Sequence, residues 1–298
     1  MRVFKGLDDV GEISKAVVTT GSFDGVHVGH KVILKRLANL ARSSGGESVL
    51  LTFHPHPRKI LFPETAGKTL KLINSQQEKI ALLEKTGLDN LVIIPFTLEF
   101  SQLSSFDFIR KVLVGQLHAR TVVVGFNHHF GHKHEGGFED LYQLGKYHDF
   151  SVEEIPQQDI ENETVSSTRI RKAITDGKIQ RANAYLDHYY MIMGELKKSD
   201  KANAFGITIT EECKLIPPPG FYAVTVLQDG LYAKALLSIQ PGNEPDGVVE
   251  FIVTEDVPIR ANAVATLHFH KQIREGLTDY NNNNSLELLK NEIAELIY

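Results

Sequence analysis

The sequence predicts an α/β domain built on a parallel sheet, followed by a smaller domain of antiparallel strands. In the first 185 residues, apolar runs of strand length alternate with amphipathic segments of helix length. The strands are nearly unbroken Val, Ile and Leu, which is typical of parallel strands buried on both faces. From about residue 186 the strands become short and are separated by Pro- and Gly-rich turns. We therefore expect two domains, residues 1–185 and 186–298.

In the first domain the expected strands and helices follow one another in a βα order. The strands are expected at 16–20, 48–53, 91–95, 121–125 and 151–155. The helices are expected at 32–42, 76–86, 105–117 and 141–148. This order predicts a doubly wound parallel sheet with helices on both faces.

In the second domain, turns separate shorter strands. The strands are expected at 221–227, 232–238 and 248–254, and the turns at 217–220, 240–247 and 256–258. This spacing fits an antiparallel sheet or a small barrel. A polar break at 281–284 precedes a C-terminal amphipathic helix at 285–297.

The composition limits the function classes. With 42% hydrophobic and 23% charged residues, both domains can bury a core, and the formal net charge of −5 argues against a general nucleic-acid binder. A single cysteine, Cys213, excludes an internal disulfide framework and a multi-cysteine zinc site. The charged N-terminus and the lack of a long apolar run predict a cytoplasmic protein without a membrane partner. Composition does not predict the oligomeric state.

The most informative segment is GSFDGVHVGH, residues 21–30, between the first apolar strand and the first helix. In an open parallel sheet, ligands bind at turns that follow the carboxyl ends of strands. Gly21 and Gly25 allow the backbone to approach a phosphate chain closely. His27 and His30 share one face of the helix start and can donate hydrogen bonds to a polyphosphate. The alternative, two surface histidines at a helix cap, does not account for the flanking glycines.

A second segment, VSSTRIR at 165–171, combines hydroxyls and arginines at a helix start. Ser166 or Ser167 is a natural N-cap. Arg169 and Arg171 lie near the end of the helix that disfavours cations, a cost of roughly 0.3–1 kcal/mol each that a bound phosphate would reverse. The alternative is a solvated basic helix start that pairs with upstream glutamates.

Two more segments follow strands. In VGFNHHFG, residues 124–131, Asn127 could ligate Mg²⁺ or contact a nucleotide. A transition metal is also suggested by the histidines His128, His129, His132 and His134, together with His54 and His56. Tight zinc sites usually show i,i+4 histidine pairs on a helix or added carboxylates, and no such arrangement occurs here. We favour loop histidines beside a phosphate site. In TFHPHPR, residues 52–58, the prolines predict an extended loop that forms a rim or flap.

Together these four segments resemble the bacterial bifunctional riboflavin kinase/FAD synthetase family, in which GSFDGVHVGH corresponds to the HxGH nucleotidylyltransferase signature. The resemblance covers the N-terminal domain almost completely and implies a Rossmann-like fold. It assigns catalytic roles to His27, His30, Asp24 and Arg171. It assigns nucleotide binding to Gly21, Ser22, Phe23, Gly25, Gly125, Asn127, Ser166, Ser167 and Thr168. It places Phe53, His56 and Pro57 in a flavin or rim loop.

The resemblance also implies the chemistry. The AMP moiety of ATP would be transferred to FMN by in-line displacement, with release of pyrophosphate and no covalent nucleophile. His27 and His30 would stabilise the transition state. Asp24 and Asn127 would position the nucleotide and Mg²⁺, and Arg171 with the adjacent hydroxyls would hold the phosphates.

The C-terminal domain resembles the riboflavin kinase barrel of this family only in outline. Near residues 198–212 the Pro-Thr-Ala-Asn step of the family, whose Thr and Asn would bind Mg²⁺ and ATP phosphate, is absent. SIQPGNEPDG at 238–247 replaces a second motif. Glu250 matches the catalytic glutamate of the family, although a glutamate on a strand is commonly a solvated side chain. We therefore expect riboflavin kinase activity to be weak or lost.

Three alternatives remain at this point. The protein could be fully bifunctional, with a kinase loop that has diverged and still works. It could act on another acceptor, such as a cytidylyl or nicotinamide substrate. It could also be a flavin-binding protein without catalysis, although simple binding does not need transition-state groups.

Overall fold

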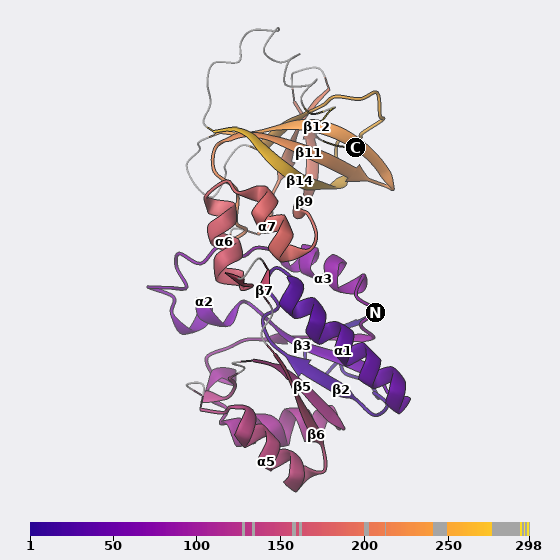
Figure 1. Ribbon diagram of the computed structural model, residues 1–298, viewed down its shortest axis with the longest axis vertical. Coiled ribbons are helices and arrows are strands. Elements are labelled where there is room, and N and C mark those ends of the chain that lie inside the picture. Colours follow the sequence, from indigo (N-terminus) through magenta and orange to yellow (C-terminus); the bar gives the residue numbers. More distant parts are fainter. Residues whose placement is uncertain are drawn as a thin grey trace. The chain divides into compact units, whose positions relative to one another are not determined.

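The computed structural model describes residues 1–126, 129–132, 135–156, 159–160, 163–199, 203–211, 213–240, 249–275, 293, 295 and 297. They form two compact units, drawn in Figure 1. The first unit comprises residues 1–70 and 79–165, and the second comprises residues 71–78 and 166–298. The proposed division at residue 185 differs from this grouping, which assigns 166–185 to the second unit. Each unit is described separately.

The first unit is built on a six-stranded sheet in which every neighbouring pair is parallel. Its strands are β1 (Arg2–Phe4), β2 (Val17–Thr20), β3 (Ser48–His54), β4 (Asn90–Pro95), β5 (Thr121–Gly125) and β6 (Ser151–Ile155). Their spatial order is β1-β4-β3-β2-β5-β6. Strands β2, β3 and β4 succeed one another in one direction, whereas β5 and β6 extend from the other side of β2. The strand order therefore reverses between β2 and β5, which is where open α/β sheets bind ligands.

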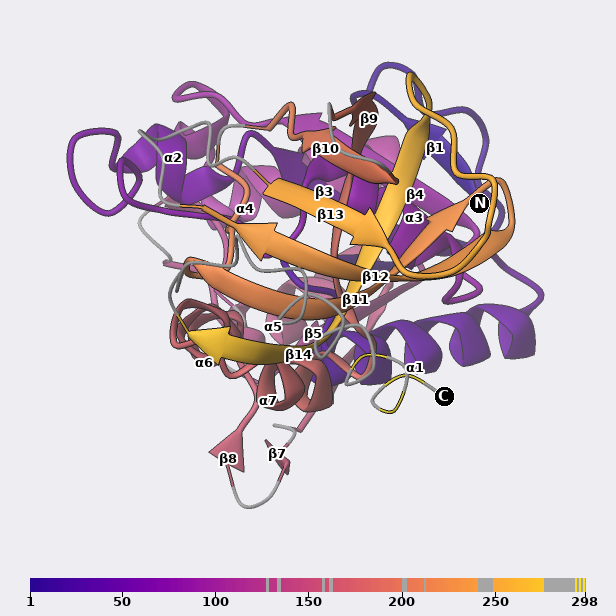
Figure 2. The ribbon, with the colours of Figure 1, turned by 90° about the horizontal axis from the view of Figure 1, so that it is seen from above.

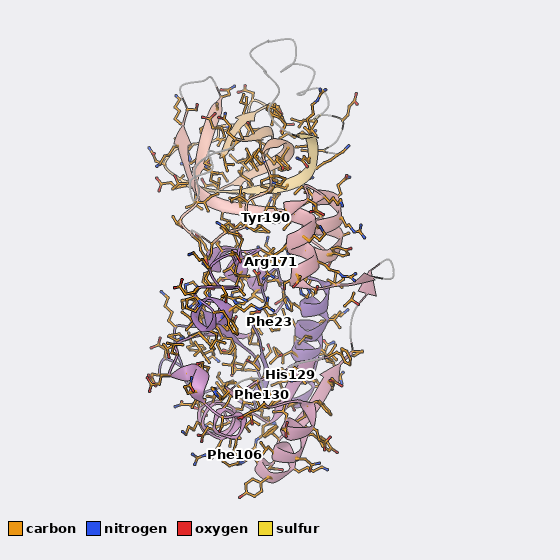
Figure 3. All side chains as sticks on the ribbon, turned by 90° about the vertical axis from the view of Figure 1, so that its left-hand side faces the viewer. Phe23, Phe106, His129, Phe130, Arg171 and Tyr190 are labelled. Atoms are coloured by element: carbon orange, nitrogen blue, oxygen red, sulfur yellow. The ribbon has the colours of Figure 1, made fainter. Side chains whose placement is uncertain are left out.

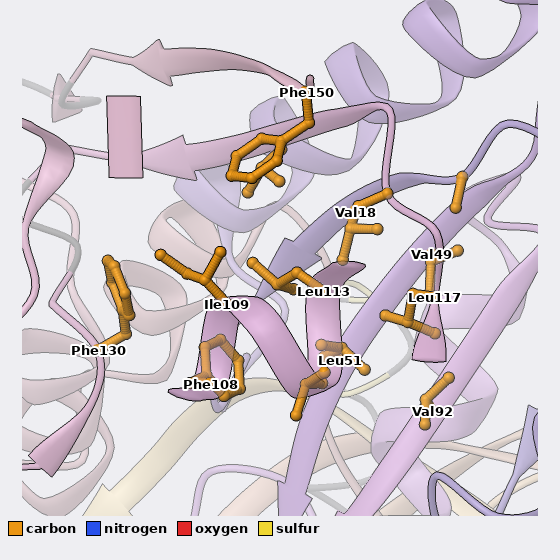
Figure 4. Close-up of a cluster of buried hydrophobic side chains, with 14 of the residues drawn as sticks. Val18, Val49, Leu51, Val92, Phe108, Ile109, Leu113, Leu117, Phe130 and Phe150 are labelled. Atoms are coloured by element: carbon orange, nitrogen blue, oxygen red, sulfur yellow. The ribbon is translucent and has the colours of Figure 1, made fainter. Parts of the chain in front are cut away.

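Helices cover both faces of this sheet. The helices between residues 28 and 148 are α1 (Val28–Ser44), α2 (Pro57–Leu61), α3 (Gln76–Glu84), η1 (Phe100–Gln102), α4 (Ser105–Asp107), η2 (Phe108–Gln116) and α5 (Phe138–His148). On one face, alternate strand residues such as Val49 and Leu51 pack against Ile109 and Leu113 of η2 (Figure 4). The intervening residues, such as Leu50, are also buried and point to the other face. Helix α1 packs on β2, β3 and β5 and buries Leu34, Leu37 and Ala41.

The expected strands and helices of the first unit are confirmed, with differences at three places. Helix α1 begins at Val28, before the apolar periodicity starts. The expected helix at 105–117 is one turn of α-helix followed by a π-helix, η2. The expected extended loop at 52–58 is wrong in part, because Pro57 begins the short helix α2. Proline is favoured at the first position of a helix, where its missing N–H is not needed.

The second unit contains a closed antiparallel barrel, so the barrel alternative is confirmed (Figure 2). Its strands are β9 (Tyr190–Lys198), β10 (Ala204–Thr208), β11 (Gly220–Gln228), β12 (Leu231–Ile239), β13 (Val249–Val253) and β14 (Val264–Glu275). The order is β10-β13-β12-β11-β14-β9, and β9 pairs with β10 to close the barrel. Inside, the fully buried rings of Tyr190 and Tyr222 pack edge-on against Phe269, at centroid distances of 5.3 and 5.6 Å.

Two helices precede the barrel, α6 (Ser167–Thr175) and α7 (Ile179–Leu186). Asn183 of α7 donates to the carbonyl oxygen of Phe269 on β14, at 2.8 Å. Strands β7 (Asp159–Ile160) and β8 (Glu163–Thr164) form a small antiparallel pair in the first unit.

Of the expected C-terminal helix, only Ile293, Glu295 and Ile297 belong to the described residues. Ile293 and Ile297 are buried and pack in a cluster with Phe221 and Leu236 of the barrel. In the part of the chain that the structure describes, none of the helices has the length and apolar character needed to span a membrane.

Candidate active site

The loop between β2 and α1 adopts a left-handed backbone at three positions. The φ angles are +48° at Phe23, +92° at Gly25 and +42° at Val26. Glycine accepts such values freely. A bulky or β-branched residue is held there at a cost of about 1–3 kcal/mol, and only when its surroundings fix it. Both Phe23 and Val26 are buried, with 3% and 0% of their surface exposed. The loop is therefore a strained turn fixed by packing.

This turn brings three aromatic rings into a stack. The imidazoles of His27 and His30 lie face to face with their centroids 3.6 Å apart, and the phenyl ring of Phe23 stacks on His30 at 4.5 Å. Figure 3 labels Phe23 within the first unit. Gly29 lies beside the stack, since a Cβ there would come within 3.3 Å of the His27 ring. The prediction that His27 and His30 lie together is confirmed.

The histidine pair lies at the N-terminus of α1. His27 is the N-cap residue, and the first turn of the helix contains no acidic side chain. The first N–H groups of a helix have no partner within it, and the positive end of the helix dipole attracts anions. The location therefore suits a phosphate group.

His30 is held in its neutral form. Burial lowers its pKa well below the ordinary value, and the neighbouring charges of His27 and Lys79 lower it further. Its Nδ1 atom is buried and has no hydrogen-bond partner among the described residues. A neutral imidazole carries one N–H donor and one acceptor nitrogen. His30 can therefore donate a hydrogen bond to a phosphate oxygen without carrying a charge of its own.

Lys79 and Thr52 are site residues that the sequence analysis missed. The Nζ atom of Lys79 donates to the Ser22 carbonyl at 3.3 Å and to Thr52 Oγ1 at 3.2 Å. Both side chains are buried, Lys79 on α3 and Thr52 on β3. Lys79 shares a helix face with the buried Leu82 and Leu83, but the sequence of α3 shows no distinct apolar face that would have indicated this burial.

The neighbouring strand ends bring further predicted residues to this edge of the sheet. Gly125 ends β5, and a Cβ there would come within 3.0 Å of Ile33 on α1. This glycine thus allows the strand to approach the helix closely. The exposed Phe126 follows it, whereas Asn127 and its expected roles lie outside the described residues.

The end of β3 supplies the predicted rim loop. The Phe53 ring packs edge-on against Phe96 at 5.5 Å, and His56 caps α2 by accepting a hydrogen bond from the Arg58 backbone at 3.2 Å. Pro57 is the first residue of α2. Phe53 therefore packs partly into the hydrophobic core. A role of this loop in flavin binding stays a prediction.

The predicted phosphate-binding hydroxyls lie in the second unit. Ser166 is the N-cap of α6, and its side chain accepts from the Arg169 backbone at 3.4 Å. Ser167 and Thr168 form the first positions of the helix. Arg171, labelled in Figure 3, donates through Nε to the carbonyl oxygen of Lys71 at 2.9 Å. The predicted N-cap is confirmed, and phosphate binding stays a prediction.

Glu250 lies in the barrel on β13. Its register partner on β10 is Gly206, and Ser199 Oγ donates to its Oε1 at 3.5 Å. Glu250 is half-buried and hydrogen-bonded within the barrel wall. Most of the expected turn at 240–247 lies outside the described residues.

No group of three or more His, Cys, Asp and Glu side chains that could hold a metal ion occurs among the residues placed by the structure. His132, one of the histidines that suggested a transition metal, contacts the Ser101 carbonyl through Nδ1 at 3.1 Å. His128 and His134 lie outside the described residues.

A parallel sheet that carries a histidine-bearing glycine loop at its strand-order switch is an open α/β fold with this loop at the place where such sheets bind ligands. The family model "FAD synthetase" matches residues 10–169. A bifunctional riboflavin kinase/FMN adenylyltransferase from Listeria monocytogenes is 35% identical over 231 residues, which cover 75% of this chain and 71% of the relative. A protein of the same name from Pseudomonas fluorescens is 30% identical, over 92% of this chain and 90% of its own length. The chain belongs to the FAD synthetase family of enzymes.

The fold also matches a solved structure. A protein from Streptococcus pneumoniae, described as a macrolide-efflux protein, superposes with a TM-score of 0.84 at 24% identity. The match covers 99% of this chain and 97% of the other. At this level of identity, the likeness shows a shared fold and nothing of function.

Proposed function

We propose that this protein transfers the AMP moiety of ATP to FMN, producing FAD and pyrophosphate. The observation that carries the proposal is the His27–His30 ring stack at the N-terminus of α1, beside the switch in strand order, in a chain of the FAD synthetase family. The substrates follow from the curated relatives, which are named FMN adenylyltransferases. Cytoplasmic location stays a prediction from the sequence.

The reaction needs little covalent chemistry from the protein. The FMN phosphate oxygen attacks the α-phosphorus of ATP, and the bond to the leaving pyrophosphate breaks. Negative charge develops on the phosphate oxygens in the transition state, so preorganised N–H donors accelerate the step. The neutral His30 and its partner His27 provide such donors, and the N-terminal N–H groups of α1 provide more.

Further residues of the proposed site would orient the two substrates. Asp24 is buried in the catalytic loop, with 4% of its surface exposed, and its carboxylate fits the oxygen donors that Mg²⁺ prefers. When bound, Mg²⁺ neutralises charge on the triphosphate. We assign to Ser166, Ser167, Thr168 and Arg171 the binding of the phosphate chain and pyrophosphate.

Riboflavin phosphorylation by the barrel is the second candidate activity. The curated relatives are named bifunctional, which favours it. The segment near residues 198–212 lacks the Pro-Thr-Ala-Asn step that the family resemblance predicts there, which argues against it. We propose that the kinase activity is weak or lost and that the barrel remains as a flavin-binding or scaffold domain.

The test is to incubate the full-length protein with MgCl₂ and ATP, with FMN in one reaction and riboflavin in the other. Chromatography then separates riboflavin, FMN and FAD. FAD from FMN alone would support both parts of the proposal. FAD from both substrates would leave the adenylyl transfer standing and refute the loss of kinase activity.

Two variants assign each activity to its unit. His30→Ala should abolish most FAD formation from FMN, and Glu250→Gln should not affect it. If riboflavin is phosphorylated, Glu250→Gln should stop that reaction while His30→Ala leaves it intact. No product from FMN in the wild-type protein would contradict the proposed adenylyl transfer.

A further inference from the structure

Three polar groups at the start of the catalytic loop contact one another in a closed triangle. Lys79 Nζ is 3.2 Å from Thr52 Oγ1 and 3.3 Å from the Ser22 carbonyl oxygen, and Thr52 Oγ1 donates to the same oxygen at 3.2 Å. The three residues come from α3, β3 and the loop after β2. The Lys79 and Thr52 side chains are buried, with 7% and 0% of their surface exposed.

The Ser22 carbonyl is the last main-chain group before the left-handed turn begins at Phe23. Just upstream, the Gly21 N–H donates to the Leu51 carbonyl at 3.0 Å and thereby continues the pairing of β2 with β3. Beyond it, the backbone has positive φ at Phe23, Gly25 and Val26. Such conformations persist only when the surrounding structure fixes them. The triangle therefore holds the chain where strand pairing ends and the strained turn starts.

Stability alone does not account for a lysine at this place. A buried ammonium group is unfavourable compared with an apolar side chain of similar volume. Lys79 is also close enough to His30 to help lower the pKa of that imidazole. Its position thus affects both the backbone of the catalytic loop and the charge state of a catalytic histidine.

We propose that Lys79 and Thr52 are positioning residues for adenylyl transfer, which hold the Ser22 carbonyl and so fix the turn that presents Asp24 and His27. They do not touch the reacting atoms. The inference rests on the proposed function, because it concerns the geometry of the same loop.

The first test compares steady-state kinetics with ATP and FMN. Lys79→Met and Thr52→Val should lower kcat by up to ~10²-fold, the loss expected when reacting groups are displaced by about 1 Å. KM for ATP and FMN should change by less than roughly threefold, since few binding contacts are lost. Thr52→Ser keeps the hydroxyl and should restore most of kcat.

Ser48→Ala is the matched control. Ser48 lies on the same strand as Thr52, is equally buried, and bonds through Oγ to Asp89 Oδ2 at 2.7 Å, at the opposite end of β3. It should lower the free energy of unfolding without lowering kcat. If Ser48→Ala and Thr52→Val lower kcat to the same extent, the positioning role is refuted.

A second readout needs no substrate. Amide hydrogen exchange of the folded protein should rise at residues 21–27 in Lys79→Met and Thr52→Val, and at the amino ends of β3 and β4 in Ser48→Ala. Unchanged exchange at 21–27 would overturn the proposal, whatever reaction the protein catalyses. A wild-type protein that forms no FAD would refute the proposed function, while exchange would still decide the role of the triangle. Thr52→Val preserves side-chain shape, so it serves if Lys79→Met fails to fold.

Discussion

Polar residues have opposite roles at the two ends of the parallel strands. At the amino ends of the strands, the amino edge of the sheet, polar groups bond to one another. Ser48 Oγ donates to Asp89 Oδ2 and accepts from the Asp89 N–H, while the Asn90 amide donates to Glu47 and accepts from Arg2. Each such bond contributes about 0.5–1.5 kcal/mol to stability.

At the carboxyl ends of the strands, the carboxyl edge of the sheet, not every buried hydrogen-bonding atom has a partner among the described residues. Here the backbone is left-handed at Phe23 and Val26, two imidazoles are stacked, and His30 Nδ1 has no partner among the described residues. Strain and unmade hydrogen bonds lower stability, and they concentrate at functional sites. The comparison teaches that the strands are anchored by hydrogen bonds at one end and followed by the strained loop of the proposed site at the other.

Among the variants that test this difference between the two edges, His30→Ala should have the largest effect, a fall in kcat. Removing one transition-state donor should lower kcat by roughly 10²–10³, about 2.7–4 kcal/mol. ATP binding should remain largely intact, as measured by calorimetry with a non-hydrolysable analogue. His118→Ala, which removes an exposed histidine in the same unit, is the control. Unchanged turnover in His30→Ala would show that the catalytic pair is assigned wrongly.

At the amino edge, Asn90→Leu should act on stability alone. The side chain is fully buried and makes three hydrogen bonds, to Arg2, Glu47 and the Ser48 carbonyl. Loss of these bonds, above all the one that satisfies the buried Ser48 carbonyl, should lower the free energy of unfolding by about 1–3 kcal/mol. Urea titration measures this loss, and kcat of the folded protein should not change. A fall in kcat would mean that the two edges are not independent.

Gly29→Ala should change activity and stability in opposite directions. Alanine in place of glycine within a helix stabilises by roughly 0.5–1 kcal/mol. The new Cβ would lie 3.3 Å from the His27 ring and must push it aside. We expect kcat to fall about tenfold, equivalent to about 1.4 kcal/mol, while the thermal midpoint rises or stays constant. Higher kcat together with higher stability would contradict the tight fit around His27.

The smallest expected effect is the part of the pH dependence of stability that His30 contributes. Burial, with help from the charges of His27 and Lys79, holds the pKa of His30 below its ordinary value of 6.5. Between these two pKa values, the unfolded chain binds more protons than the folded protein, so the stability contributed by neutral His30 is lost as pH falls below about 6.5. Urea titrations at about pH 7.5 and 5.5 should show a smaller decrease for His30→Phe than for the wild type. An equal decrease would mean that His30 is not buried as described.

Much of the fold could be predicted because its strands carry strong local signals. The runs 121–125 and 151–155 coincide with β5 and β6, and Gly87 follows closely on the end of α3. The helix at 105–117 was placed correctly, but its π-geometry depends on tertiary packing. The strand β1 was missed because three residues carry no measurable periodicity.

The site was predictable where its chemistry is local in sequence. The loop at 21–30 contains the glycines and both histidines, so the motif could be recognised directly. Lys79 and Thr52 come from separate segments, α3 and β3, and Thr52 reaches the Ser22 carbonyl only when β3 pairs with β2. Neither the burial of Lys79 nor its partners could be inferred from the helix pattern, because α3 has no distinct apolar face. The orientation of the Phe23 ring over His30 likewise depends on a left-handed backbone that no sequence pattern specifies.

The strand order described above has a consequence for self-association. Unpaired strand edges are templates for aggregation, and short or charged edge strands discourage it. The sheet ends at β1, which has three residues, and at β6, where Glu153 is bound by Arg36 at 2.6 Å. The described barrel strands close on one another. The two outer strands of the six-stranded sheet are thus a short strand and a strand with two glutamates, Glu153 and Glu154, and both features discourage a second copy from extending this sheet.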